Sequence, residues 1–222
     1  MENAATTPLD QIRQRITAAA RIAGRKPEEV TLVAISKTHG PDTIRPLLDQ
    51  GHRVFGENRV QEAAAKWPAL RAFYPGVELH LVGQLQSNKA DDAVALFDCI
   101  HSLDRPSLIA ALSRAMDKAS RKVPCFLQVN IGEEDQKGGC AIADIPALLA
   151  MAGEAGIPVV GLMAVPPLEV EPAPYFALLD KLAADHGLPC LSMGMSGDFE
   201  TAILLGATHV RVGSALFGAR PD

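Results

Sequence analysis

The stretch Thr31-Leu32-Val33-Ala34-Ile35-Ser36-Lys37 decides the fold of this 222-residue chain. β-Branched and apolar residues fill most of its first five positions, which is typical of a strand that a parallel sheet buries on both faces. Ligands of α/β folds sit at the carboxyl ends of the strands, where Lys37 stands. An amine held against apolar walls there is a candidate Schiff-base former. The alternative is a lysine that marks where the strand meets water.

The composition indicates an ordinary globular protein with one domain over residues 1–222. Hydrophobic residues make up 48% of the chain and charged residues 21%, with a net charge of −5. The net negative charge and the scattered basic residues argue against a basic surface patch that would bind nucleic acid. No apolar run reaches the roughly 20 residues that a membrane span needs, and Met1 to Asp10 lacks the pattern of a signal peptide. We therefore expect a cytoplasmic protein that contacts no membrane.

The four cysteines make neither a disulfide framework nor a metal site that can be recognised from spacing. They are widely separated and form no C-x-x-C pair: Cys99, Cys125, Cys140 and Cys190. The spacing argues against a zinc site, and Cys99, Cys125 and Cys190, which lie in strand-like segments, are predicted to be buried thiols.

Strand patterns and helix patterns alternate along the whole chain. Thr7 and Pro8 predict a helix over about residues 8–24, because threonine caps helix N-termini and proline suits the first turn. Eight strands follow, separated by helical segments: 31–37, 53–58, 78–82, 99–103, 123–131, 158–165, 190–193 and 209–212. This count predicts a (β/α)₈ TIM barrel of the α/β class. An open doubly wound sheet is the alternative, although the first turn lacks a G-x-G-x-x-G motif.

The predicted strand ends share a polar character and would meet at one mouth of the barrel. They are Lys37, Glu57 with Asn58, Gly83 with Gln84, His101 with Ser102, Asn130, Met163, Ser192 and Arg211. Small residues follow the last two strands, in Gly194-Met195-Ser196-Gly197-Asp198 and Gly213-Ser214, where barrels commonly bind phosphate. Asp198 could instead serve only as a helix N-cap. A Schiff-base lysine beside a phosphate site suggests pyridoxal 5′-phosphate, the commonest phosphorylated aldehyde cofactor.

Several motifs carry a family resemblance that covers nearly the whole chain in order. They are residues 33–37 (VAISK), 55–62 (FGENRVQE), 80–89 (HLVGQLQSNK), 100–104 (IHSLD), 161–163 (GLM), 191–196 (LSMGMS) and 210–218 (VRVGSALFG). Together they resemble the YggS/PROSC family of pyridoxal phosphate homeostasis proteins, whose barrel is similar to that of fold-type III enzymes such as alanine racemase.

The resemblance implies a role for each of seven residues. Lys37 would form the Schiff base, Ser196, Gly213 and Ser214 would hold the phosphate, Arg211 would bond the pyridine nitrogen, and Asn58 and Met193 would line the ring. Gly197 lies in the phosphate turn and departs from the resemblance, since many members of the family carry a larger polar residue there, and we expect it only to loosen that turn.

Arg211 gives the expected site a particular chemistry. Arginine stays protonated and can only donate hydrogen bonds, so it keeps a facing pyridine nitrogen unprotonated. An unprotonated ring is a poor electron sink, which disfavours carbanion chemistry. Without the resemblance, Arg211 could equally be an outward residue in a salt bridge.

The expected function is a carrier or buffer in pyridoxal phosphate homeostasis, without strong catalysis. A racemase needs a second acid/base, and the only tyrosines, Tyr74 and Tyr175, are poorly placed, while His39 is near Lys37 but expected in solvent. Apo-enzymes that need the cofactor are possible partners, and we expect a monomer. The alternatives are a small amino-acid racemase and, less favoured, a cofactor-free Schiff-base aldolase with Glu57 as proton shuttle.

Overall fold

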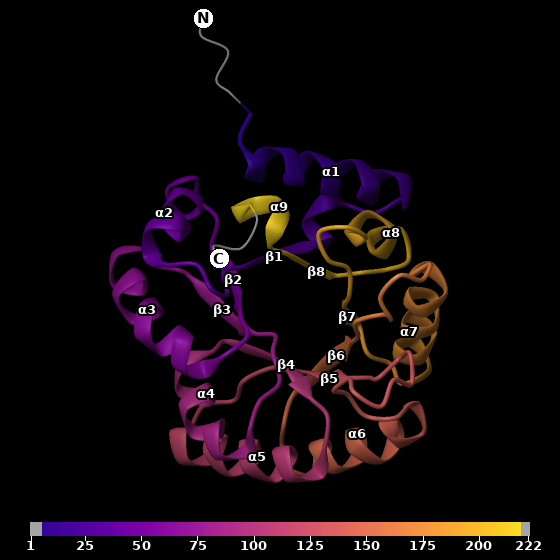
Figure 1. Ribbon diagram of the computed structural model, residues 1–222. Helices are drawn as coiled ribbons and strands as arrows, with labels where there is room; N and C mark the ends of the chain where they lie inside the picture. The colour runs from indigo at the N-terminus through magenta and orange to yellow at the C-terminus, as the bar shows by residue number, and fades with distance from the viewer. Residues whose placement is uncertain (1–5, 219–222) are drawn as a thin grey trace, which may run out of the picture.

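A closed barrel of eight parallel strands forms the centre of the protein in the computed structural model, which describes residues 6–218. Each strand pairs with the next, and β1 closes the ring with β8 (Figure 1). The strands are β1 (Thr31–Ile35), β2 (Val54–Glu57), β3 (Glu78–Leu81), β4 (Cys99–Leu103), β5 (Cys125–Gln128), β6 (Val159–Met163), β7 (Cys190–Ser192) and β8 (His209–Val212). This confirms the predicted (β/α)₈ barrel.

Helices surround the barrel on its outside, as Figure 1 shows. The α-helices are α1 (Pro8–Ile22), α2 (Pro41–Asp49), α3 (Val60–Phe73), α4 (Ala90–Leu96), α5 (Pro106–Ala119), α6 (Ile145–Glu154), α7 (Ala173–Asp185), α8 (Phe199–Leu204) and α9 (Ser214–Phe217). Short 3₁₀ helices are η1 (Pro27–Glu29), η2 (Ser87–Lys89) and η3 (Ile142–Asp144). Among the described residues, no helix is both long and apolar enough to cross a membrane.

Two layers of side chains follow from the alternation of residues along each strand. Ile100 and Leu127 face outward into the main core beneath the helices. Cys99 and Phe126 point the other way and pack inside the barrel. Successive side chains of a strand point to opposite faces, so a strand with two buried faces fills both layers.

The first helix begins where the sequence predicts it. The Thr7 hydroxyl accepts a hydrogen bond from the Asp10 N–H, and the Asp10 carboxylate accepts one from the Thr7 N–H, which completes a capping box. The apolar face of α1 is buried, and Arg15 lies 2.6 Å from Glu200 of α8. The helix therefore lies against the last part of the barrel, where β8 meets β1.

The structure differs from the sequence prediction mainly at element ends. The first strand ends at Ile35 and leaves Lys37 in the loop. The helical segment between β5 and β6 starts as η3 and becomes α6 only at Ile145. The short helix α9 was not expected, because four residues carry no periodic signal.

Buried histidines link the stability of this fold to pH. His52 is 6% exposed, and burial lowers its pKa to about 4 while its Nε2 bonds the Val54 carbonyl at 2.7 Å. The unfolded chain binds the proton more tightly, so this histidine lowers the free energy of unfolding as pH falls from its ordinary pKa towards 4. We expect a loss of about 3 kcal/mol from His52 alone over that interval.

Urea unfolding from pH 7 to pH 4 measures this loss. His52→Gln should flatten the pH dependence, whereas His186→Gln, at an exposed position, should leave it unchanged. Equal slopes for the wild type and His52→Gln would contradict the assignment.

Candidate functional site

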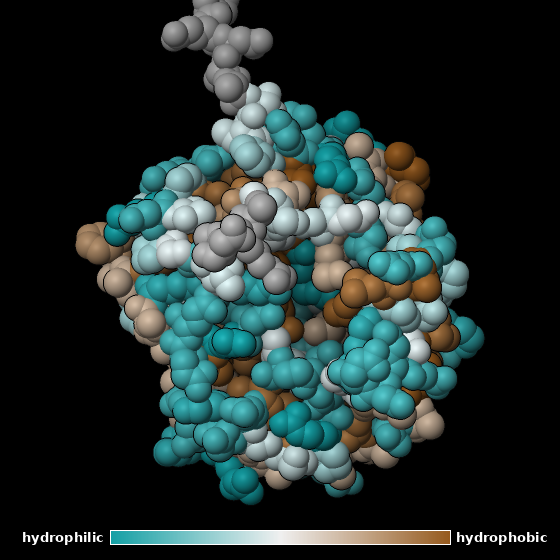
Figure 2. Space-filling model, viewed as in Figure 1, coloured by the Kyte–Doolittle hydropathy of each residue, from teal (hydrophilic) through white to brown (hydrophobic). Residues whose placement is uncertain are grey.

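A cavity of about 410 Å³ opens at the carboxyl ends of the strands. The space-filling view shows that this face is hollowed near its centre, with hydrophilic residues around much of the hollow (Figure 2). Seven of the eight residues expected to bind a cofactor line it: Lys37, Asn58, Ser196, Gly197, Arg211, Gly213 and Ser214. Apolar side chains also line it: Ile35, Val82, Met163, Val165 and Met195.

Met193 is the exception among the expected residues. Its side chain is fully buried in the core shared with the outer helices, outside the described lining of the cavity. The neighbouring Met195 lines the cavity instead. A role for Met193 beside a bound ring therefore stays a prediction.

The loop that carries Lys37 is fastened by helix α3. The Lys66 ammonium donates to the carbonyl oxygens of Ser36 at 2.9 Å and His39 at 3.0 Å, on either side of Lys37. The Glu62 carboxylate accepts from the Thr38 N–H at 2.6 Å. Thr38 has a φ of +66°, an unusual conformation for a β-branched residue, and these bonds hold it there. The position of Lys37 therefore depends on α3.

A buried ion pair lies directly behind that loop. Lys66 Nζ is 2.9 Å from Glu57 Oε1, and the two side chains are 7% and 0% exposed. The Ser36 hydroxyl and the Trp67 N–H donate to the same Glu57 oxygen at 2.5 and 3.0 Å. Burial still raises the pKa of Glu57, although these three neighbours oppose the rise. Glu57 is thus a structural anchor, and it does not line the cavity as the aldolase hypothesis needs.

Arg211 reaches the cavity from inside the barrel wall. Its Nη1 donates to the Ser192 hydroxyl at 2.6 Å and its Nη2 donates to the Ala164 carbonyl at 2.9 Å. Burial lowers its pKa to about 10, with Asp198 opposing the shift, so the guanidinium remains charged at neutral pH. Two fixed acceptors hold its plane, which makes it an oriented donor rather than the outward salt-bridge residue that the sequence left open.

The two turns rich in small residues lie side by side. The Gly213 N–H donates to the Ser196 hydroxyl oxygen at 3.3 Å, which joins the turn after β7 to the turn after β8. Gly194 has a φ of +90°, and a Cβ there would approach Ala202 Cβ to 2.6 Å, so only glycine fits this bend. Asp198 stands at the N-cap position of α8, but its carboxylate accepts from the Met195 N–H instead of capping the helix.

A close contact between two backbone segments fixes the position of Asn58. A Cβ on Gly83 would lie 2.3 Å from the Asn58 carbonyl oxygen, so the loop after β3 can approach the loop after β2 only with glycine there. Gln84, expected at the same mouth, bonds Gln128 at 2.7 Å and lies outside the described cavity lining.

Two histidines lie elsewhere than the sequence predicted. His101 was expected at the mouth, yet it stands in the middle of β4 and is fully buried inside the barrel. His39, expected in solvent, lines the cavity and stacks on Phe217 with ring centroids 4.8 Å apart. Sequence reasoning missed the contributions of Thr38, His39 and Met195, because loop residues show no periodicity that would reveal their direction.

Comparison with known proteins places this geometry in a family. Residues 8–221 match the model of the alanine racemase N-terminal domain. The chain is 42% identical over 218 residues to the pyridoxal phosphate homeostasis protein of Pseudomonas aeruginosa, covering 96% of this chain and 94% of that protein. The Escherichia coli K12 protein of the same name is 38% identical over 225 residues, covering 96% and 95%.

The chain belongs to the pyridoxal phosphate homeostasis protein family. A solved structure of a relative, PipY of Synechococcus elongatus PCC7942 with pyridoxal phosphate bound, has a TM-score of 0.82 and 38% identity. That alignment covers 94% of this chain and all of the PipY chain. The family predicted from the motifs is therefore confirmed.

Removal of the Lys66 charge tests the anchoring of the Lys37 loop. Lys66→Met leaves the buried Glu57 carboxylate without its cation, and we expect it to lower the free energy of unfolding by about 3–5 kcal/mol. The double variant Lys66→Met/Glu57→Gln should recover much of that loss, because it also removes the buried carboxylate that the single variant leaves without a cation.

Urea unfolding of both variants measures the effect. Lys118→Met is the matched control, since Lys118 and Asp91 form an exposed pair at 2.7 Å that should contribute at most about 1 kcal/mol. A Lys66→Met variant no less stable than Lys118→Met would rule out the anchor.

Proposed function

We propose that this protein binds pyridoxal 5′-phosphate in the cavity through Lys37 and takes part in the homeostasis of that cofactor. The observation that carries the proposal is the meeting, in one cavity, of a lysine, a buried oriented arginine and two hydroxyl-bearing turns. The names of the relatives and the pyridoxal phosphate in the PipY structure support it.

The residues of the cavity fit such a group. Ser196 and Ser214 supply hydroxyl donors on joined turns, and Gly197 leaves open space where a side chain would stand. The nearby carboxylate of Asp198 is engaged by the Met195 N–H. Ile35, Val82 and Met163 offer apolar surface for an aromatic ring. When bound, the cofactor supplies an aldehyde that condenses with a primary amine, together with a phosphate that needs several donors.

The properties of Arg211 favour a protein that binds the cofactor without using it for strong catalysis. Its guanidinium keeps its proton, and the Ser192 and Ala164 oxygens fix its direction. A group that can only donate keeps a facing ring nitrogen unprotonated, which weakens the ring as an electron sink. We therefore propose a carrier or buffer without strong catalysis, whose possible recipients are apo-enzymes that need this cofactor. A cytoplasmic location and a monomeric state remain predictions from the sequence.

A weak racemase is the second candidate, and His39 is the observation that favours it. Tyr74 donates to Asp49 at 2.7 Å at the end of α3, and Tyr175 packs against the core at the start of α7. Neither lines the described cavity, whereas His39 does. Burial, followed by Lys66, lowers the pKa of His39, so its imidazole is neutral at pH 7 and able to accept a proton.

Visible absorbance of the purified protein with added pyridoxal phosphate tests the binding proposal. We expect a yellow band that borohydride bleaches, with the reduced adduct mapped to Lys37 by mass spectrometry and no adduct in Lys37→Ala. Lys89→Ala, which removes a lysine outside the described cavity lining, is the matched control and should stay yellow. A wild type that stays colourless would defeat the proposal.

Turnover of amino acids separates carrier from racemase. With the cofactor bound, we expect racemisation of alanine and other amino acids to stay near the rate of free pyridoxal phosphate. A rate far above that reference, lost in both Lys37→Ala and His39→Ala, would establish the racemase instead.

A further inference from the structure

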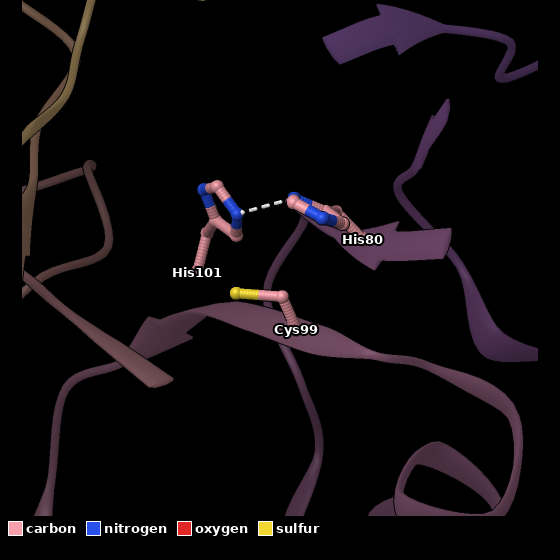
Figure 3. A group of neighbouring side chains, drawn as sticks. All are labelled: His80, Cys99 and His101. Carbon is pink, nitrogen blue, oxygen red and sulfur yellow. Dashed lines mark hydrogen bonds between the residues drawn. The ribbon is translucent and has the colours of Figure 1, made fainter. Parts of the chain in front are cut away.

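Three metal-ligating side chains meet inside the barrel, away from the cofactor cavity. His80 of β3 and Cys99 and His101 of β4 each offer one ligand atom, and the three atoms lie within 4.8 Å of one another. His80 pairs with Cys99 in the register of the two strands, and Cys99 and His101 are two residues apart, so all three point inward. Figure 3 shows the sulfur and the two rings around a common space.

The two imidazoles face each other through ring nitrogens. His80 Nδ1 lies 3.0 Å from His101 Nε2, so one hydrogen is shared between them (Figure 3). A metal ion bonded to both nitrogens at about 2.0–2.1 Å would occupy the place of that hydrogen, with the rings separated by a few tenths of an ångström more. The Cys99 sulfur lies within 4.8 Å of the other two ligand atoms and would complete a three-coordinate site by moving closer to them.

The outer nitrogen of His101 already has a partner of the kind that metal-bound histidines use. His101 Nδ1 lies 2.8 Å from the Ser192 hydroxyl, which fixes the orientation of its ring and leaves the inner nitrogen free to ligate. The outer nitrogen of His80 faces a carboxylate at a longer distance, because Glu78 lies 3.9 Å from His80 Nε2, beyond hydrogen-bond distance. The bond from His101 to Ser192 is independent of the spacing of the three donors.

We propose that His80, Cys99 and His101 form a binding site for one soft monovalent metal ion, Cu⁺. Thiolate and imidazole ligands suit such an ion. Charge also favours it over Zn²⁺, because Cu⁺ with one thiolate and two neutral imidazoles adds no net charge. The buried cation of Arg211 is bonded to the same Ser192 hydroxyl, and it would repel a site with a net positive charge.

Binding releases one proton and changes no oxidation state. Burial raises the pKa of the Cys99 thiol well above its usual range, so the free thiol is protonated, and its S–H bond breaks as the metal–sulfur bond forms. The hydrogen between the rings moves to an outer ring nitrogen, where Ser192 or Glu78 accepts its hydrogen bond. The thiol proton leaves to water at the amino-terminal end of the barrel, where the Glu78 side chain is 63% exposed.

Anaerobic titration of the full-length chain with Cu⁺, in competition with the chelator bicinchoninate, tests the site. We expect one Cu⁺ per chain, bound about 100-fold more weakly by Cys99→Ser and His80→Gln and about 10-fold more weakly by Glu78→Gln. Cys125→Ala is the matched control, because Cys125 is equally buried but belongs to the outer core, and it should bind as the wild type does. Copper X-ray absorption should show one sulfur and two nitrogen ligands.

Several outcomes would overturn the proposal. A wild type that takes no Cu⁺ from the chelator, or a Cys99→Ser variant that binds as tightly as the wild type, would leave the cluster as a hydrogen-bonded pair that supports Ser192 and Arg211. Tighter binding of Zn²⁺ than of Cu⁺ would refute the charge argument. If the variants unfold in thermal melts, the ligands seen by X-ray absorption in the wild type decide.

Discussion

The buried pairing of Lys66 with Glu57 is the constraint on which the candidate site depends. Lys66 comes from the first half of α3, and its ammonium spans the carboxylate at the end of β2 and the two carbonyl oxygens that flank Lys37. A charged side chain that is buried away from water is stable only when several groups of opposite polarity surround it. The contacts that stabilise the buried Lys66 charge also fix the backbone on both sides of Lys37. At this end of the barrel, the contacts that stabilise the fold are therefore the same contacts that set the geometry of the site.

The second fixed charge of the site is arranged in a similar way. Arg211 is held by oxygens of two other strand ends, and one of them, the Ser192 hydroxyl, continues through His101 to His80. A polar path therefore runs from the cavity through the interior of the barrel towards its amino-terminal end. Barrel interiors are usually filled by branched apolar residues, so this path is a departure from the ordinary packing. Its hydrogen bonds orient the guanidinium from behind, on the side away from the cavity.

The sequence predicted the barrel because short apolar runs, typical of strands buried on both faces, alternate with helical patterns, and it predicted most of the site because parallel strands end at a common face. Seven expected residues line the cavity. The sequence did not reveal that His101 lies within the barrel. A strand pattern indicates whether a side chain points into or out of the barrel, but it does not show how far along the barrel axis the residue lies. It also failed to indicate that His39 and Met195 turn inward, because loop directions depend on tertiary contacts such as the stacking of His39 on Phe217. The dispersed histidines and Cys99 meet only through strand register, which spacing along the chain does not show.

The closure of β1 on β8 has a consequence for biosynthesis. Val33 pairs with Arg211 across this seam, so Lys37 and Arg211 belong to opposite ends of the chain and yet share one cavity. A ribosome delivers the lysine early and the arginine and the serine-bearing turns last. A growing chain can expose the amine long before it can form the surrounding cavity, and a fragment lacking β8 would retain the lysine without Arg211 and the turn that follows β8. The complete cavity is thereby confined to the finished barrel.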